Sequence, residues 1–193
     1  MGQYGGQSCP EIDLMEANQH AFHATPHVCA DPDENGNYAA EHCDVHGDSY
    51  RMNFSKGKAV YSREYGPSKE FTINTKKPFH VKTTFLTEDG KFTGITTDVT
   101  QDGKIVTKKN DNQAYLQEIY EEVSKGQVLV IASWEGDDHW LRDSTTNCPD
   151  LQFPWDSKQY TISNITVRSP QFEKPLCNPS HPTKEACARG FEQ

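Results

Sequence analysis

The sequence predicts an all-β fold, an antiparallel β-sandwich, from three features of its pattern. Apolar and polar residues alternate, as they do in strands with one buried face, at residues 71–74, 79–85, 104–107 and 160–167. A nearly continuous apolar run at 128–134 is typical of a strand buried on both faces. Turn signals such as Glu88-Asp89-Gly90 and Gln101-Asp102-Gly103 separate the segments at intervals typical of sandwiches.

One short helix is expected among these strands, over residues 112–124. Its apolar residues recur at helical spacing and would form one buried face: Tyr115, Leu116, Ile119, Tyr120 and Val123. Gly126 follows directly and predicts the end of the helix.

The composition limits the class of function. The 193 residues suffice for one domain or for part of a larger one, and a 10% aromatic content argues against disorder. The net charge of -9, with no stripe of Lys and Arg, argues against nucleic-acid binding and suits neutral ligands such as sugars. No apolar run reaches the roughly 18 residues of a membrane helix, so no membrane partner is expected.

The six cysteines predict disulfides and a secreted protein, because none of them forms a C-x-x-C metal or redox motif. Cys29 and Cys43 bracket a turn-rich loop and are expected to form a local bridge. Cys177 and Cys187 bracket a Pro-rich tail and are expected to form another.

Two cysteines, Cys9 and Cys148, then remain; they could pair with each other or with cysteines absent from this chain. The first residues lack the apolar core of a signal peptide, so we expect an N-terminal part to be missing. Acceptor sequons at Asn53 and Asn164 are compatible with secretion.

The segment Glu11-Ile12-Asp13-Leu14-Met15-Glu16-Ala17-Asn18 places three carboxylates within six positions. On a strand, Glu11 and Asp13 share a face, whereas Glu16 points the other way unless a β-bulge lies between Asp13 and Glu16. Three acids on one face are typical of a raised-pKa acid beside an ionised nucleophile. The alternative is a helical turn, in which Asp13 and Glu16 form an ordinary solvated pair.

Two further segments contain possible metal ligands, but the spacing of the ligands argues against a metal site in both. The spacing of His20, His23 and His27 fits neither H-E-x-x-H nor one strand face, so a sugar hydrogen bond from one of them is the preferred role. Residues 31–36 match the first half of an EF-hand loop, but His42 occupies the position of the bidentate Glu. No metal and no cofactor are therefore expected.

The acid segment, with Thr25-Pro26-His27-Val28-Cys29 after it, closely resembles the catalytic segment of glycoside hydrolase family 7, the secreted cellobiohydrolases and endoglucanases. Further segments resemble that family in the same order: 43–53, 70–77, 128–144 and 162–167. The resemblance covers the C-terminal half of the family's catalytic domain. It assigns residues 1–172 to that half and leaves 173–193 as the Pro-rich tail.

The resemblance implies a concanavalin-like β-sandwich, or jelly roll, with a concave cleft that is incomplete in this chain. It implies retaining hydrolysis of β-1,4-glucosidic bonds in cellulose by two carboxylates. Glu11 would be the nucleophile, Glu16 the general acid/base, Asp13 the residue that holds Glu11, and His27 a helper near the leaving group. Four more residues would bind or line the sugar site: Arg51, Trp134, Trp140 and Asp143. A polysaccharide would be the partner of a monomeric full-length protein.

Two alternatives stay open at this point. Laminarinase-type β-1,3/1,4-glucanases share the acid motif, and a shortened chain could be a non-catalytic carbohydrate-binding fragment. The chain also departs from the family pattern at Met15, where a tryptophan is usual, and at Cys9, where two adjacent cysteines are usual.

Overall fold

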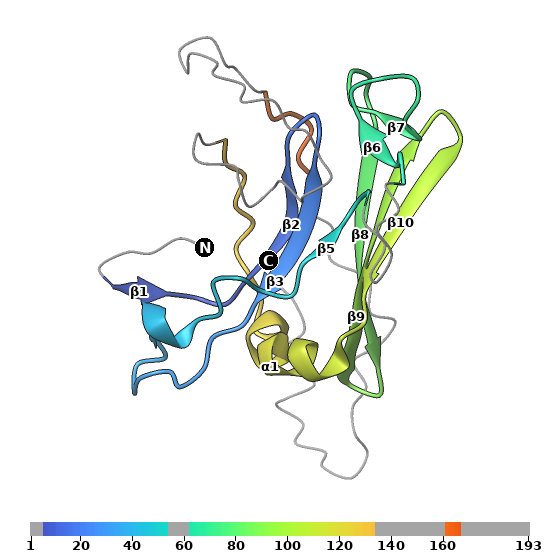
Figure 1. Ribbon diagram of the computed structural model, residues 1–193. Coiled ribbons are helices and arrows are strands. Elements are labelled where there is room, and N and C mark those ends of the chain that lie inside the picture. The colour runs from blue at the N-terminus through green and yellow to red at the C-terminus, as the bar shows by residue number, and fades with distance from the viewer. Residues whose placement is uncertain (1–5, 54–61, 134–160, 167–193) are drawn as a thin grey trace. The chain divides into compact units, whose positions relative to one another are not determined.

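A computed structural model describes residues 6–53, 62–133 and 161–166. The chain divides into two units, Met1–Gln152 and Phe153–Gln193, and every helix and strand of the described residues lies in the first. That unit contains two three-stranded antiparallel sheets, in the orders β2-β3-β5 and β10-β9-β8 (Figure 1). Their strands are β2 Glu11–Ala17, β3 Phe22–His27, β5 Tyr50–Arg51, β8 His80–Glu88, β9 Lys91–Gln101 and β10 Lys104–Asn110.

Among the described residues, two short strand pairs and two helices complete the unit. The pair β1–β4 is antiparallel, whereas β6–β7 is parallel. Their bounds are β1 Gln7–Ser8, β4 Tyr38–Ala39, β6 Tyr65–Gly66 and β7 Ile73–Asn74. A 3-10 turn, η1, covers Ala40–His42, and the α-helix α1 covers Gln113–Ser124.

The meander β8–β9–β10 is joined by two Asp-Gly turns. Asp89 and Gly90 have φ of 50° and 72°, and Asp102 and Gly103 have φ of 50° and 74°. Two successive residues at positive φ form the type I′ turn, whose twist matches that of a hairpin. The turns predicted from the sequence at these two places are confirmed.

The core of the unit lies between the two sheets and against α1. Alternate residues of β9, namely Ile95, Thr97 and Val99, are completely buried, as one face of a covered strand should be. Phe22 and Ala24 of β3 belong to the same hydrophobic cluster. A buried hydrogen bond of 3.0 Å between the hydroxyls of Tyr50 and Thr97 also links the two sheets.

The helix confirms its sequence prediction. Asn112 is the N-cap, and its side chain accepts a hydrogen bond from the backbone N–H of Tyr115. Leu116 and Ile119 are buried, and the other three residues of the predicted face pack partly against the core. Gly126 follows at a φ of 98° and donates its N–H to the carbonyl of Val123, which closes the helix.

Two predicted strands, at 128–134 and 160–167, are wrong in their described parts. Residues 128–133 and 161–166 have no regular secondary structure, and Val128 is 87% exposed. A strand buried on both faces needs neighbours for its N–H and C=O groups, and no strand of the described residues pairs with either segment. The segment predicted at 71–74 is shorter than expected, because only Ile73–Asn74 pairs, in parallel with β6.

The disulfide predicted between Cys29 and Cys43 is confirmed. It fixes the loop between β3 and β5, where the two cysteines also form an isolated bridge. Cys9 is an exposed free cysteine, whereas Cys148, Cys177 and Cys187 lie outside the described residues.

The side chain of Asn53, the acceptor residue of the first sequon, is buried and hydrogen-bonded in the folded chain. Asn53 is 1% exposed, its amide nitrogen donates to the carbonyl of Tyr65 at 2.8 Å, and its amide oxygen accepts from the N–H groups of Glu64 and Tyr65. The side chain therefore holds β6 in place. Asn164 is exposed.

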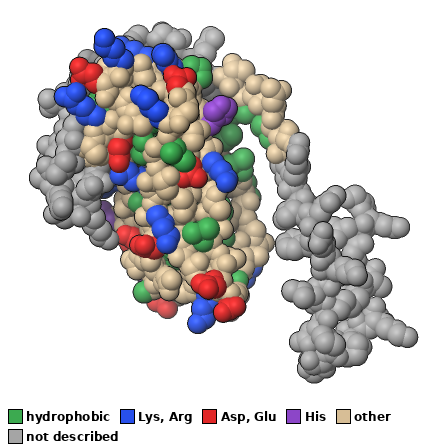
Figure 2. Space-filling model, turned by 90° about the vertical axis from the view of Figure 1, so that its right-hand side faces the viewer, with side chains coloured by type: hydrophobic (Ala, Val, Ile, Leu, Met, Phe, Trp, Pro, Cys, Tyr) green, Lys and Arg blue, Asp and Glu red, His purple; other side chains and the backbone are tan. Residues whose placement is uncertain are grey.

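Figure 2 shows one face of the molecule, on which acidic and basic side chains are interspersed. Exposed ion pairs occur in the described part of the chain; Lys125, for example, lies 3.0 Å from Glu121 and 3.1 Å from Glu122. Among the described residues, no helix is both long and apolar enough to cross a bilayer.

Candidate active site

The three carboxylates lie on one strand, β2, whose pairing with β3 contains a β-bulge. Asp13 pairs with Thr25, but Glu16 pairs with His23, so three steps along β2 match two steps along β3. The extra residue lies between Asp13 and Glu16, as predicted from the spacing. The bulge confirms that this segment is a strand and excludes the helical-turn alternative.

The register places all three acids on one face of the sheet. Directly opposite residues share a face, and the acid-bearing rows are Glu11–His27, Asp13–Thr25 and Glu16–His23. The opposite face carries Phe22 and Ala24 into the core. The acid face is therefore separated from the core by the sheet itself.

His27 links Asp13 to the loop that follows the disulfide. Its Nε2 atom lies 3.1 Å from Oδ2 of Asp13, and its Nδ1 atom lies 2.8 Å from the backbone carbonyl of Asp44. Burial by itself lowers the pKa of His27, but the Asp13 carboxylate, the Asp44 carbonyl and the charge of Glu11 outweigh it and raise the pKa overall. The imidazolium form is thus favoured beside the two acids.

Glu16 has the electrostatic environment of a general acid. Burial, and then repulsion by the Asp13 carboxylate, raise the pKa of Glu16 to about 7. Attraction by His27 and a hydrogen bond of 3.4 Å from the Thr25 hydroxyl act in the opposite direction. The Thr25 hydroxyl is also 3.1 Å from that of Ser49. Near neutral pH, Glu16 can therefore hold a proton.

The sequence analysis assigned no role at this site to three residues near His27: Asp44, Gly47 and Tyr115. The Tyr115 hydroxyl donates to the Asp44 carboxylate at 2.9 Å, so α1 fixes the loop whose carbonyl holds His27. Gly47, at a φ of 59°, passes directly against β3 beside Thr25 and His27. Helical spacing assigned Tyr115 to the core face of α1, and the spacing contains no signal for its hydroxyl contact.

The predicted sugar-binding residues are only partly described. Arg51 pairs with His23 across β3–β5, so it lies in the same row and on the same face as Glu16. Trp134, Trp140 and Asp143 lie outside the described residues. Arg51 is therefore the one of these four whose position relative to the acids is known.

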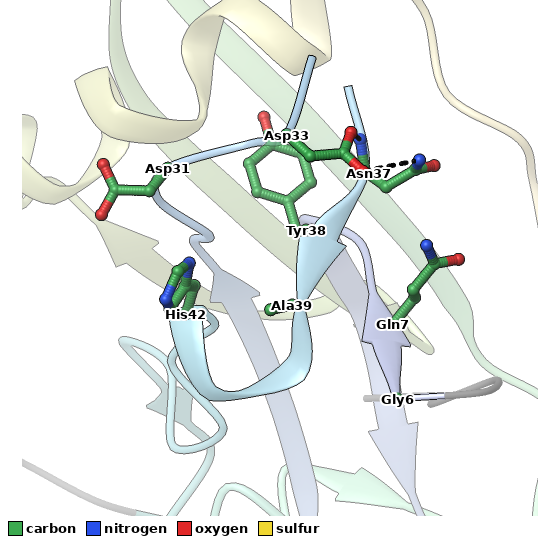
Figure 3. A pocket seen from close by; sticks show the side chains of 8 residues that line it. All are labelled: Gly6, Gln7, Asp31, Asp33, Asn37, Tyr38, Ala39 and His42. Carbon is green, nitrogen blue, oxygen red and sulfur yellow. Dashed lines mark hydrogen bonds between the residues drawn. The ribbon is translucent and has the colours of Figure 1, made fainter. Parts of the chain in front are cut away.

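A pocket of about 240 Å³ lies elsewhere, beside β1, β4 and η1 (Figure 3). Its loop is the segment that resembles half an EF-hand. Asp33 accepts hydrogen bonds from the N–H groups of Asn35 and Asn37 and from the side-chain amide of Asn37. Asp31 points away from this group in Figure 3. The carboxylate of Asp33 is thus used in the turn of the loop itself, as in the surface loop that the sequence favours.

Comparison with known proteins places this site in a family. The sequence model of glycosyl hydrolase family 7 matches residues 1–128. Endoglucanase EG-1 of Humicola insolens is 38% identical over 113 residues, which are 52% of this chain and 24% of that protein. Endo-beta-1,4-glucanase celB of Emericella nidulans is 33% identical over 118 residues, which are 52% of this chain and 27% of that protein.

A solved structure supports the fold as well. The native structure of the Humicola insolens endocellulase EGI matches 62% of this chain and 37% of its own chain, with 27% identity and a TM-score of 0.52. The chain thus spans about a quarter of the curated relatives and just over a third of the solved one. Because the family match covers well over half of the chain and includes the bulged acid strand, the chain belongs to glycosyl hydrolase family 7.

Proposed function

We propose that this chain carries the catalytic acids of a secreted β-1,4-glucanase that hydrolyses cellulose with retention of configuration. One observation carries the proposal: the bulge brings Glu11, Asp13 and Glu16 to one face, where the pKa of Glu16 is raised to about 7. Relatives named endoglucanases and endo-beta-1,4-glucanases support the substrate class. The disulfide Cys29–Cys43 supports an oxidising, extracellular location.

In the proposed mechanism, Glu11 attacks the anomeric carbon and forms a glycosyl-enzyme. Glu16, which starts protonated, gives its proton to the departing glycosidic oxygen and then takes one from the water that hydrolyses the intermediate. Asp13 lies in the row between them, and its repulsion raises the pKa of Glu16 and so favours the protonated form of Glu16. His27, whose Nε2 lies 3.1 Å from Asp13, acts in the opposite direction and lowers the pKa of Glu16.

Sugar binding is proposed for Arg51, which lies in the row of Glu16, and for Trp134, Trp140 and Asp143 by resemblance. We also propose that residues 1–172 form the family's part of the chain, and that 173–193 form a tail closed by Cys177 and Cys187. No cofactor takes part in this mechanism, and the full-length protein is proposed to act as a monomer.

Replacing the nucleophile tests the proposal. Glu11→Gln should lower turnover of cellohexaose about a thousandfold or more while substrate affinity stays within a few-fold. Glu70→Gln is the matched control, because Glu70 is an exposed glutamate that is paired with Arg63 and belongs to neither β2 nor β3. Unchanged turnover in Glu11→Gln would show that Glu11 is not the nucleophile. The anomer released first, read by NMR, tests retention.

The short span of the family that the chain covers favours one competing function. A non-catalytic carbohydrate-binding fragment would bind cellohexaose and release no product. Binding is measured on the same chain by calorimetry, so binding without hydrolysis would replace the catalytic proposal. Faster hydrolysis of β-1,3-linked or mixed-linkage glucan than of cellulose oligomers would favour the laminarinase-type alternative.

A further inference from the structure

The candidate active site contains a group of three side chains that can bind a metal ion. One oxygen of Glu11, one of Asp13 and one ring nitrogen of His27 all lie within 4.8 Å of one another. His27 is 5% exposed, and Glu11 and Asp13 are half-buried. His27 therefore forms the buried side of the group, and Glu11 and Asp13 form the side that solvent partly reaches.

The orientation of His27 is that of a metal ligand. Its Nδ1 faces the Asp44 carbonyl at 2.8 Å, and because a carbonyl can only accept, Nδ1 carries a proton. Nε2 lies 3.1 Å from Oδ2 of Asp13, and when a metal ion displaces the proton of Nε2, the lone pair of this atom faces the acids. Histidines that bind metals are held in this way, with the second ring nitrogen donating to a carbonyl or carboxylate.

The oxygen that faces this lone pair is also suited to a cation. Oδ2 of Asp13 is buried and, although it lies 3.1 Å from Nε2 of His27, it accepts no well-aligned hydrogen bond. A carboxylate oxygen and an imidazole nitrogen on a tetrahedral zinc ion are about 3.4 Å apart, given metal–ligand lengths of about 2.0–2.2 Å. The observed pair is therefore already near the spacing that an ion requires.

We propose that Glu11, Asp13 and His27 form a binding site for a zinc-class divalent cation, and that the bound ion inhibits the enzyme. Two carboxylates and one imidazole leave a fourth position for water, as in other open zinc sites. The ion would coordinate the carboxylate of Glu11, which could then no longer attack the anomeric carbon. Inhibition rests on the function proposed above, whereas binding of the ion does not.

The donor set selects the class of metal. Calcium takes six to eight oxygen ligands and magnesium prefers water and carboxylates, whereas imidazole suits zinc, copper, nickel and cobalt. The site supplies one imidazole and two carboxylates, which are too few oxygens for calcium. The loop around Asp33 shows the contrast, since the carboxylate of Asp33 accepts hydrogen bonds from the N–H groups of Asn35 and Asn37 in the same loop (Figure 3).

Zinc chloride titrated into the full chain, in a buffer that does not bind metals, tests the site by calorimetry. We expect one tight site that is weakened at least tenfold in His27→Gln, whose amide can still donate to Asp44, and also in Glu11→Gln. The controls are His46→Gln and Cys9→Ser, which remove an exposed histidine and the exposed free thiol. Both should leave the affinity unchanged.

Cobalt provides an independent readout of the same ligands. Co²⁺ bound at a four-coordinate site should give intense visible absorption bands, and zinc should displace it. Each variant is checked by circular dichroism; if His27→Gln does not fold, Glu11→Gln carries the test. Wild-type zinc affinity in the folded variants, or loss of the tight site in Cys9→Ser or His46→Gln, would overturn the proposal.

Measuring hydrolysis in the presence of zinc distinguishes the proposed metal site from the proposed catalytic function. A chain that hydrolyses cellohexaose should lose activity in proportion to zinc occupancy and recover it with a chelator. Hydrolysis without zinc binding would overturn the metal site and leave the catalytic function standing. Zinc binding through these ligands without hydrolysis would do the reverse, and full activity at full occupancy would overturn inhibition.

Discussion

Replacing Gly47 with alanine should destabilise the chain far more than an ordinary loop substitution does. Gly47 lies before β5 at a φ of 59°. A Cβ built there would be 2.4 Å from Cγ2 of Thr25, 2.5 Å from the carbonyl oxygen of Pro26 and 2.9 Å from Cε1 of His27. All three distances are shorter than real contacts of a Cβ atom, and the Pro26 oxygen belongs to the backbone.

The cost has two parts of comparable size. A left-handed backbone conformation costs an alanine about 1–2 kcal/mol relative to glycine. Overpacking costs a further 1–3 kcal/mol, roughly, when the neighbours must shift. The Pro26 carbonyl cannot move freely, because it accepts a hydrogen bond of 3.1 Å from the N–H of Asp48. The sum is a loss of about 2–5 kcal/mol in the free energy of unfolding.

A second glycine separates these two parts. Gly90, in the β8–β9 turn, has a φ of 72° and no atom within 4 Å of its built Cβ. Gly90→Ala should therefore lose only the backbone cost, about 1–2 kcal/mol. Urea unfolding of both variants gives the packing cost at Gly47 as the difference between them.

The same substitution should also disturb His27. If the chain accommodates the new methyl group by moving His27, its ring resonances in NMR should shift, whereas Gly90→Ala should leave them unchanged. A Gly47→Ala variant no less stable than Gly90→Ala, with unshifted His27 resonances, would refute the packing described for this loop.

Three further predictions concern the acid, the disulfide and the core. Folding raises the pKa of Glu16 from 4.5 to about 7, so the folded chain binds this proton more tightly and the free energy of unfolding should fall as pH rises between these values. Glu16→Gln should remove that pH dependence, measured by urea unfolding. Hydrolysis by the wild type should decline above about pH 7. Replacing Cys29 and Cys43 by alanine opens a loop with a sequence separation of 14 and should cost about 3 kcal/mol, measured by urea unfolding. Leu116→Ala removes a completely buried side chain and should cost about 2–5 kcal/mol, whereas a loss below about 1 kcal/mol would contradict its place in the core.

Local rules predicted the parts of the fold in which the chain's own neighbours decide the structure. The helix at Gln113–Ser124 follows from apolar spacing and from Asn112 as N-cap. The Asp-Gly turns follow from the positive φ that a two-residue hairpin needs. The disulfide Cys29–Cys43 follows from a short loop with a cysteine at each end.

The errors and omissions arise where distant residues decide. The apolar run at 128–133 has the composition of a buried strand, but a strand forms only beside another strand. Asn53 matches a glycosylation motif, yet its amide is used by the backbone of β6. The contact of Tyr115 with Asp44 joins residues 71 positions apart, which no periodicity reveals.

The bulge in β2 serves the core and the acid face at once. Ile12 and Ala17 are five positions apart, yet both pack against the core, which a regular strand of period two cannot achieve. Glu11 and Glu16 are also five apart and share the opposite face. One extra residue satisfies both pairs, with Ile12 opposite Pro26 and Ala17 opposite Phe22. A β2 without the bulge that kept Ile12 in the core would turn Ala17 out of the core and Glu16 into it, so the arrangement of the acids depends on packing against the other side of the sheet.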